Sequence, residues 1–222
     1  MQTIFKDRTD AGVRLARALE DYRNRNVLVL AIPRGGVEVG YQVARYLDAD
    51  FSIVITRKLP FPDNPEAGFG AIAEDGSTFI FRDATRSLPP PTVERIIHQQ
   101  QKELDRRIRV LRGGEPLPEI ADRTVILVDD GIAMGSTMRA SIQLIKEQGA
   151  GKIVVATPVA SWWVAQEIEA MVDQVVVLTK PASFRAVAQV YQEWYDVPDT
   201  KVLEILDKWR RERTSPPSVS EE

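Results

Sequence analysis

The chain has 222 residues, an ordinary globular composition, a formal net charge of −3 and no cysteine. This length suits one α/β domain with an appendage and is enough to bury a sizeable core. The charge gives no support to nucleic acid as a partner, and the absence of cysteine excludes disulfides, thiolate metal sites and a cysteine nucleophile.

The N-terminal segment is polar and carries Lys6, Asp7 and Arg8 among its first ten residues. It lacks the apolar stretch of a signal peptide, and no run in the chain approaches the ~20 apolar residues of a membrane span. We therefore expect a cytoplasmic protein with no membrane partner. Residues 11–22 then place apolar side chains at helical spacing among charges, which predicts an amphipathic helix.

An alternation of strands and helices follows. The apolar run VLVLAI at residues 27–32 predicts a buried strand, which ends at a proline and two glycines. Residues 37–47 predict a helix, and FSIVIT at residues 51–56 predicts the next strand. Short apolar strands that alternate with helices are typical of a parallel sheet.

A long insertion, residues 59–123, separates the second core strand from the third. Its first part, residues 59–70, is rich in proline and glycine, which predicts a mobile loop. Residues 70–81 predict a hairpin that turns at residues 74–76, and residues 91–112 predict a long, charged helix. A connection of this length inside a compact domain is usually functional or disordered.

The second half of the chain returns to the alternating pattern. Apolar runs predict strands at residues 124–128, 152–157 and 174–179. Helical spacing predicts helices between them, at residues 136–147 and 162–171. Each strand is therefore followed by a helix or a turn, as in the first half.

These elements predict one α/β domain over residues 1–210, with a parallel sheet covered by helices on both faces. Its core spans about residues 27–58 and 124–179, and residues 180–210 follow the last core strand. The proline-containing, acidic end at residues 211–222 predicts a disordered tail. Ligands of such sheets bind at the carboxyl ends of the strands, where candidate site residues are to be sought.

The most specific motif is VILVDDGIAMGST at residues 125–137. An apolar strand delivers Asp129 and Asp130 to its carboxyl end, and a glycine turn then leads into a helix. Backbone N–H groups at a helix N-terminus bind phosphate, and Ser136 and Thr137 add hydroxyl donors. The carboxylates suit ribose hydroxyls and a hydrated Mg²⁺. A purely structural acidic turn is the alternative, although adjacent carboxylates are unfavourable without a cation or hydroxyl partner.

This motif resembles the PRPP-binding motif of the type I phosphoribosyltransferases, where PRPP is 5-phosphoribosyl-1-pyrophosphate. The resemblance covers the two core segments, and the chain as a whole looks like the stand-alone group of phosphoribosyltransferases predicted from sequence. It implies that Asp129 and Asp130 are catalytic, orient the ribose and hold Mg²⁺ through water. It also implies a loop that binds the 5′-phosphate, formed by Gly131, Ile132, Ala133, Met134, Gly135, Ser136 and Thr137.

Two positions depart from the family pattern, and a third concerns the acceptor. Met134 stands where threonine is frequent, so one hydroxyl contact to the phosphate is missing. Ala133 stands where the 6-oxopurine enzymes carry an aspartate, which favours another nitrogenous base over hypoxanthine or guanine. The family covers its site with a variable hood, here residues 180–210, in which Phe184 is the candidate for stacking the acceptor. Packing within the hood is the alternative for Phe184.

Two basic segments predict the pyrophosphate side. Arg34, Gly35 and Gly36 end the first core strand, where consecutive glycines let the backbone approach an anion and arginine adds a planar donor. The resemblance implies a cis peptide bond between Arg34 and Gly35. Arg57 and Lys58 end the second predicted strand, and the resemblance makes Lys58 a catalytic cation beneath the mobile loop, which would close as a lid. Solvated strand ends are the alternative for both segments.

The charged helix at residues 91–112 carries less information. His98 is the only histidine, and its polar surroundings predict a solvated side chain rather than a base. Arginines and acidic residues alternate along this helix, which is typical of a solvated face. Nucleic acid is therefore not expected as a partner.

The resemblance implies a Mg²⁺-dependent transfer of 5-phosphoribose from PRPP to a small nitrogenous acceptor, with release of pyrophosphate. A PRPP-binding regulator without turnover and a phosphate-ester hydrolase are the alternatives. A homodimer is a further expectation for the assembly of the chain.

Overall fold

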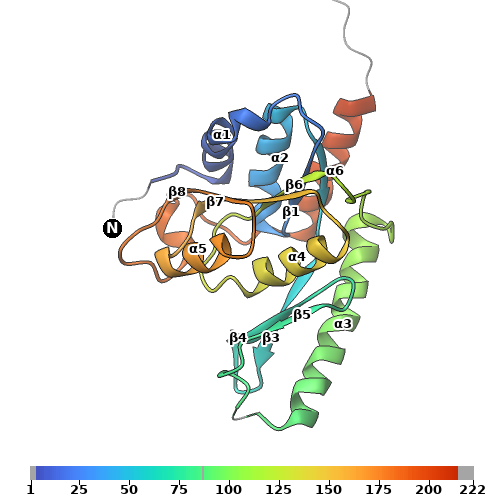
Figure 1. Cartoon of the computed structure of the whole chain (residues 1–222), viewed down its shortest axis with the longest axis vertical. Coiled ribbons are helices and arrows are strands. Elements are labelled where there is room, and N and C mark those ends of the chain that lie inside the picture. Colours follow the sequence, from blue (N-terminus) through green and yellow to red (C-terminus); the bar gives the residue numbers. More distant parts are fainter. Residues whose placement is uncertain (1–3, 87, 215–222) are drawn as a thin grey trace, which may run out of the picture.

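The computed structural model describes residues 4–86 and 88–214 (Figure 1). Its centre is a five-stranded sheet with the order β2-β1-β6-β7-β8, in which every pairing is parallel. The strands are β1 (Val27–Ala31), β2 (Asp50–Ile53), β6 (Thr124–Val128), β7 (Lys152–Val159) and β8 (Gln174–Thr179). The predicted α/β fold with a parallel sheet is confirmed.

Helices cover both faces of this sheet. Val27, Val29 and Ala31 of β1 pack into one apolar cluster with α1, α2 and α6, whereas Leu28 and Leu30 pack into a second cluster with α4 and α5. The continuous apolar runs of the sequence thus reflect strands that are buried on both faces. The helices of the main body are α1 (Arg8–Ala18), α2 (Gly35–Leu47), α4 (Ser136–Glu147), α5 (Trp162–Glu169) and α6 (Asp199–Thr214), with short 3₁₀ turns η1 (Glu20–Tyr22) and η2 (Val187–Val190).

The insertion forms a second sheet and a long helix, which extend below the main sheet in Figure 1. The sheet is antiparallel and contains β3 (Thr56–Phe61), β4 (Asn64–Ala73) and β5 (Thr78–Ile80). The predicted hairpin turn is confirmed, since the N–H of Ala73 donates to the carbonyl of Ser77 at 2.8 Å. The predicted charged helix is confirmed as α3 (Pro90–Arg112).

The sequence predicts a mobile loop at residues 59–70, but most of this segment pairs as β3 and β4. Pro60 pairs with Gly68 at a shift in register. A Cβ on Gly70 would lie 2.2 Å from the carbonyl oxygen of Phe79 in β5. Proline and glycine therefore mark an irregular hairpin with a close approach of strands rather than a loop.

The second core strand is shorter than the predicted residues 51–56. β2 ends at Ile53, and the N–H of Ile55 donates to the carboxylate of Glu74 at 3.0 Å instead of to the main sheet. The chain then enters β3. Arg57 and Lys58 consequently lie within the small sheet and not at the end of a core strand, which corrects the predicted position of both.

The chain after β8 divides into two parts. Its first part lies against the N-terminal segment, where the N–H of Phe5 donates to the carbonyl of Val190 at 2.9 Å. Its second part, α6, packs on the main body, with the Trp209 ring 5.5 Å from that of Phe51. This helix continues to Thr214, so only residues 215–222 of the predicted tail lie outside the described residues. Across the described ranges, no helix is long and apolar enough to cross a membrane.

Candidate active site

The turns that follow β1 and β6 lie side by side at the carboxyl edge of the main sheet. Ala31 is opposite Val128 in the register of the two strands, and the N–H of Ile32 donates to the carbonyl of Val128 at 2.8 Å. Because both strands end at the same level, residues 33–36 and 129–135 meet although they are far apart in the sequence. This is the edge at which parallel sheets bind ligands.

The first turn of α2 packs directly on the acidic pair. Arg34 is the N-cap of this helix, and Gly35 and Gly36 are its first two residues. A Cβ on Gly35 would lie 1.8 Å from Oδ2 of Asp130, and one on Gly36 would lie 3.0 Å from Cα of Asp129. Any side chain at these positions would displace the carboxylates. The structure therefore brings together the glycine turn and the acidic pair that the sequence singles out separately.

Asp129 and Asp130 have different surroundings. Burial raises the pKa of Asp129 well above its ordinary value, and the negative charge of Asp130 adds to this effect. Its only favourable neighbour within the pair is the backbone N–H of Asp130, which donates to Oδ1 at 2.9 Å. Asp130 instead accepts a hydrogen bond from Nε of Arg8 at 2.7 Å. One carboxyl thus resists ionisation in the free protein, whereas the other is paired with a fixed guanidinium.

Arg8, the first residue of α1, is a site residue that the sequence reasoning missed. Its guanidinium donates to Asp130 and to the carbonyl of Tyr195 at 3.0 Å, and lies 3.6 Å from Glu38. It also stacks on Trp194, 3.9 Å from the ring centre. Only 4% of its side chain is exposed. No local sequence pattern indicates this role, because Arg8 lies 122 residues from Asp130 in the chain.

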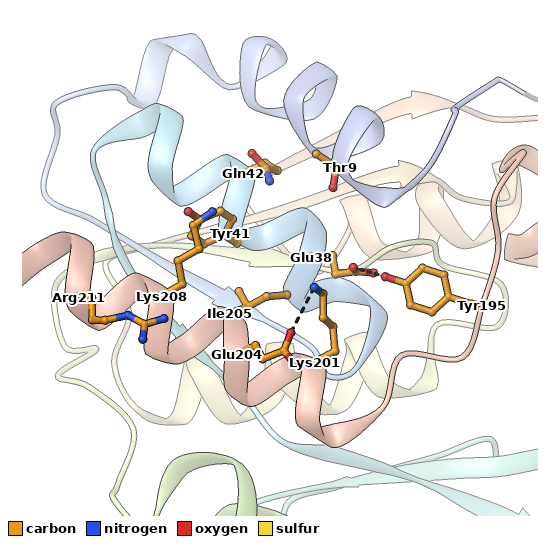
Figure 2. Close-up of a pocket in the computed structure, with 10 residues that line it drawn as sticks. All are labelled: Thr9, Glu38, Tyr41, Gln42, Tyr195, Lys201, Glu204, Ile205, Lys208 and Arg211. Atoms are coloured by element: carbon orange, nitrogen blue, oxygen red, sulfur yellow. Dashed lines mark hydrogen bonds and ion pairs between the residues drawn. The ribbon is translucent and has the colours of Figure 1, made fainter.

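A cavity of about 570 Å³ lies between α2 and α6, where Glu38, an ion-pair partner of Arg8, contributes to its lining (Figure 2). Figure 2 shows Glu38 and Tyr195 pointing toward one another at one end of it, where the Tyr195 hydroxyl donates to the Glu38 carboxylate. Burial raises the pKa of Tyr195 to about 12, and this hydrogen bond contributes. The residues that line the cavity include neither Asp129 nor Asp130. It is therefore distinct from the acidic pair, and Arg8 contacts both Glu38 in its lining and Asp130.

The turn after β6 is fixed at both ends around the N-terminus of α4. The N–H of Ile132 donates to the carbonyl of Val159 at 2.8 Å, and Arg139 donates to the carbonyl of Met134 at 2.7 Å. Gly135 is the N-cap of α4 and makes no side-chain capping bond. The first N–H groups of the helix are thus without a side-chain cap, which is the arrangement that binds phosphate. Arg139 is a second residue that the sequence reasoning missed.

Comparison with known proteins decides the family. Residues 8–191 match the model of the phosphoribosyl transferase domain. The chain belongs to this family. Two Mycobacterium tuberculosis sequences, whose names give phosphoribosyl transferase as an inferred activity, are each 37% identical over 211 residues, which is 94% of this chain and 48% of theirs. The chain therefore spans about half the length of the curated relatives it matches.

A solved structure supports the same assignment at the level of the fold. The crystal structure of TT1426 from Thermus thermophilus is 36% identical, with a TM-score of 0.78. The match covers 93% of this chain and 99% of that one. The fold shared with TT1426 therefore includes the insertion as well as the main sheet, because so little of either chain is left unmatched.

In the structure, the turn between β1 and α2 contains the cis peptide bond at another position than predicted. It joins Pro33 to Arg34, one bond before the predicted position between Arg34 and Gly35. The reason is that α2 begins at Gly35, so that the next peptide bond already belongs to the first turn of a helix. The prediction was wrong by one residue.

The structure separates the two cations of the predicted Arg57-Lys58 pair. Nε of Arg57 donates to the side chain of Gln100 in α3 at 3.1 Å. Lys58 instead lines a cavity of about 530 Å³ between the small sheet and the start of α4, together with Phe61, Ser136 and other residues. Neighbouring residues of a strand point to opposite faces, so the two side chains cannot act on one small site in the way that their adjacency suggests.

Phe184 is partly buried in the segment after β8. It packs against an apolar cluster that includes Phe5, Val159 and Tyr191. The Tyr191 hydroxyl donates to the carbonyl of Asp130 at 2.7 Å, so this cluster lies next to the acidic pair. Phe184 thus lies in a cluster beside the acidic pair, and its contacts there are packing contacts.

The acidic pair has the donor set of a magnesium site. Within residues 4–86 and 88–214, no group of three or more histidine, cysteine, aspartate or glutamate side chains could hold a metal ion. Mg²⁺ is commonly held by one or two carboxylates, several waters and the phosphates of a substrate. Asp129 and Asp130 fit this pattern, and a cation between them would relieve the repulsion that raises the pKa of Asp129.

Proposed function

We propose that this chain is a Mg²⁺-dependent phosphoribosyltransferase, which transfers 5-phosphoribose from PRPP to a nitrogenous base and releases pyrophosphate. The observation that supports it most is the contact of the α2 N-terminus with the acidic pair, which lies on the same turn that leads into the N-terminus of α4. The loop after Asp130 leads into α4, and Gly35 of α2 lies against Asp130 itself. PRPP offers matching groups in the same order, namely a phosphate, ribose hydroxyls and a pyrophosphate.

The chain's own groups would bind and orient the sugar. The N–H groups at the start of α4 and the hydroxyls of Ser136 and Thr137 would hold the 5′-phosphate. Asp129 and Asp130 would accept hydrogen bonds from the ribose hydroxyls. The bond from Arg8 to Asp130 fixes one carboxylate before the substrate arrives, which lowers the entropic cost of positioning the sugar.

The transfer breaks the bond between C1 of the ribose and the pyrophosphate oxygen while the acceptor nitrogen bonds to C1. The transition state of such glycosyl chemistry resembles an oxocarbenium ion. The α2 N-terminus with Arg34, Gly35 and Gly36 would stabilise the negative charge that builds up on the leaving pyrophosphate, with Arg57 beside it, whereas Lys58 lines the separate cavity next to Ser136. A bound Mg²⁺, held through water by the acidic pair, supplies further positive charge.

The acceptor site has two candidates. Phe184 would stack a base above the acidic pair, and Ala133 disfavours a 6-oxopurine. The second candidate is the cavity of about 530 Å³ beside the phosphate loop, which has aromatic side chains in its lining, Phe61 and Phe81. Replacing Phe184 by alanine should raise the KM of the acceptor and leave PRPP affinity unchanged if the first candidate is right. A cytoplasmic location and a homodimer stay predictions of the sequence.

A test of the proposal is calorimetry of the chain with PRPP, with and without Mg²⁺, followed by a pyrophosphate-release screen over a panel of bases with a no-base control. We expect Mg²⁺-dependent binding and a rate that requires one base. Binding without turnover on any base would instead favour the PRPP-binding regulator. A fast rate without base would favour a hydrolase, and the absence of PRPP binding would contradict the proposal.

A further inference from the structure

Four arginines gather at the N-terminus of α2, from three separate elements. We call Arg34 of the β1–α2 turn, Arg57 of β3, and Arg106 and Arg107 of α3 the arginine cluster. Half-burial lowers the pKa of Arg57 most, and the positive charges of Arg107, Arg106 and Arg34 lower it further. The sequence suggested a solvated face for α3, yet two of its arginines are held close to the predicted pyrophosphate residues.

The carboxylates near the arginine cluster do not balance its charge. Glu103 accepts from Nε and Nη2 of Arg106 at 2.8 and 2.9 Å and from Nε of Arg107 at 3.1 Å. Asp199 lies 3.6 Å from Arg34 and 4.0 Å from Arg106. Among the described residues these two carboxylates face four guanidinium groups, and the hydrogen-bond acceptor of Arg57 is the neutral Gln100. The cluster therefore keeps an excess of positive charge.

Asp199 is a poor permanent partner for this charge. Its Oδ1 atom is buried without a hydrogen-bond donor among the described residues, and its contact with Arg34 is an ion pair too long for a hydrogen bond. The pair of Glu103 with Arg106 is partly exposed, with 29% and 48% of the side chains accessible, and such pairs contribute little to stability, whereas only 14% of the Arg107 side chain is exposed. An anion with several charges could therefore take over donors of Arg34 and Arg106 at a small loss in protein contacts.

The position of the arginine cluster identifies the anion. Arg34 immediately precedes Gly35, whose backbone lies against Asp130. A ligand whose ribose reaches Asp130 would present its next group to Arg34 and to the arginines behind it. Guanidinium groups bind phosphate oxygens with two parallel hydrogen bonds, and four of them suit a diphosphate better than a single phosphate.

We infer that Arg106 and Arg107 of the insertion helix α3 are substrate-binding residues, which receive the pyrophosphate group of PRPP together with Arg34 and Arg57. This inference rests on the proposed function, since it assumes that the sugar lies on the acidic pair. It gives the insertion a direct role in binding the leaving group. Lys58, on the other face of β3, is not needed for this role.

The test compares two ligands that differ only in the pyrophosphate. Calorimetry with Mg²⁺ measures the affinity for PRPP and for ribose 5-phosphate in the wild type and in the double variant Arg106→Gln, Arg107→Gln. Glutamine keeps the helix propensity of arginine and removes the charge. We expect PRPP affinity to fall about tenfold or more, as for the loss of charge-assisted hydrogen bonds, and ribose 5-phosphate affinity to stay within about twofold.

The matched control is Arg95→Gln. Arg95 lies on the same side of α3 as Arg106, 11 residues or about 16 Å away along the helix axis, and it pairs only with Gln99 in the described structure. The Arg95→Gln substitution removes one positive charge from the same helix and should change neither the affinity for PRPP nor the affinity for ribose 5-phosphate. The single variant Arg106→Gln, at a half-exposed position, provides a well-folded form should the double variant be unstable.

Each result decides the inference. Unchanged PRPP affinity in the double variant would overturn it and leave the proposed function standing. An equal loss for both ligands would also overturn it, because the arginines would then support the fold. If the wild type binds no PRPP, the proposed function fails, and inorganic pyrophosphate becomes the probe. Binding of pyrophosphate that the double variant loses and the control keeps would still support an anion site, and no binding would overturn both.

Discussion

The carboxyl edge of the main sheet and the insertion contribute to the candidate site in different ways. At the sheet edge, the residues are contiguous and come directly after strands, as with Asp129 and Asp130 after β6. In the insertion, Arg57 lies inside a strand, and Arg106 and Arg107 lie near the end of a long helix. Parallel strands that end together fix the first group, whereas the second depends on how a hairpin and a helix pack. Changes at the sheet edge should thus weaken binding of the sugar phosphate itself, and changes in the insertion should weaken chiefly the binding of the pyrophosphate.

The largest effects are expected at the buried ion pairs that anchor each region. Arg8 binds Asp130 at the sheet edge, and Arg112 of α3 binds Glu74 and donates to the carbonyl of Ile53 at 3.1 Å. Replacing either arginine by alanine leaves a buried carboxylate without its partner. We expect each variant to lose about 3–5 kcal/mol of unfolding free energy in a denaturant titration.

The control for these variants is Arg14→Ala, which removes an exposed pair with Asp10 within α1 and should cost less than about 1 kcal/mol. The two buried variants should also differ from one another in ligand binding. Arg8→Ala should impair binding of PRPP and ribose 5-phosphate alike, and Arg112→Ala chiefly that of PRPP. A stability of Arg112→Ala equal to that of the control would show that this pair does not anchor the insertion.

Gly35→Ala should give the next largest effect, because the added Cβ would lie 1.8 Å from the Asp130 carboxylate. Overpacking of this kind costs about 1–3 kcal/mol of stability and moves the groups that are displaced. We expect PRPP binding to be lost, as calorimetry would show. The control is Gly76→Ala in the turn between β4 and β5, where no atom lies within 4 Å of the added Cβ and only the φ of +91° causes strain. PRPP affinity that survives in Gly35→Ala would contradict the packing of α2 on the acidic pair.

Asp129→Asn should separate binding from stability within the sheet edge. Burial and the charge of Asp130 raise the pKa of Asp129 above the ordinary 3.8, so above that pH the unfolded chain ionises first and the wild type loses stability. In buffer with a chelator, the variant should therefore be more stable than the wild type at pH 7, with a difference that vanishes below pH 3.8. Mg²⁺-dependent PRPP affinity should fall about 10- to 100-fold, the value of one or two hydrogen bonds to a charged group.

Asp130→Asn is the natural comparison for that variant, because it removes the charge that pairs with the buried Arg8. It should lower the free energy of unfolding at pH 7 instead of raising it. If the two substitutions changed the free energy of unfolding equally, the different surroundings of Asp129 and Asp130 would make no difference to stability.

The same comparison explains how much could be predicted from the sequence. Strands and helices of the main sheet follow from apolar runs and helical spacing, and β8 and α4 begin and end at the predicted residues. The turn after β6 and the position of the acidic pair follow too, because they are local to one strand end, whereas phosphate binding by this turn stays a prediction. Arg8, Arg106 and Arg107 could not be recognised, since only contacts between distant segments give them a role. The mobile loop at residues 59–70 was predicted from proline and glycine, which also occur in irregular strands.

The smallest effect is expected at Met134, where the two regions meet. Met134 is 66% exposed and lines the cavity of about 530 Å³ between the turn after β6 and the small sheet, near Lys58 and Ser136. Met134→Thr would add the hydroxyl that is frequent in this motif and should leave stability within about 0.5 kcal/mol, as for an exposed position. One additional hydrogen bond to the 5′-phosphate should raise the affinity for ribose 5-phosphate about two- to tenfold in calorimetry.

Met134→Val is the matched control, because valine has the shape of threonine without its hydroxyl. An equal gain in affinity in both variants would mean that the size of the Met134 side chain in the cavity limits binding. The contacts between the loop and the small sheet, and not the missing hydroxyl, would then determine the affinity for the phosphate.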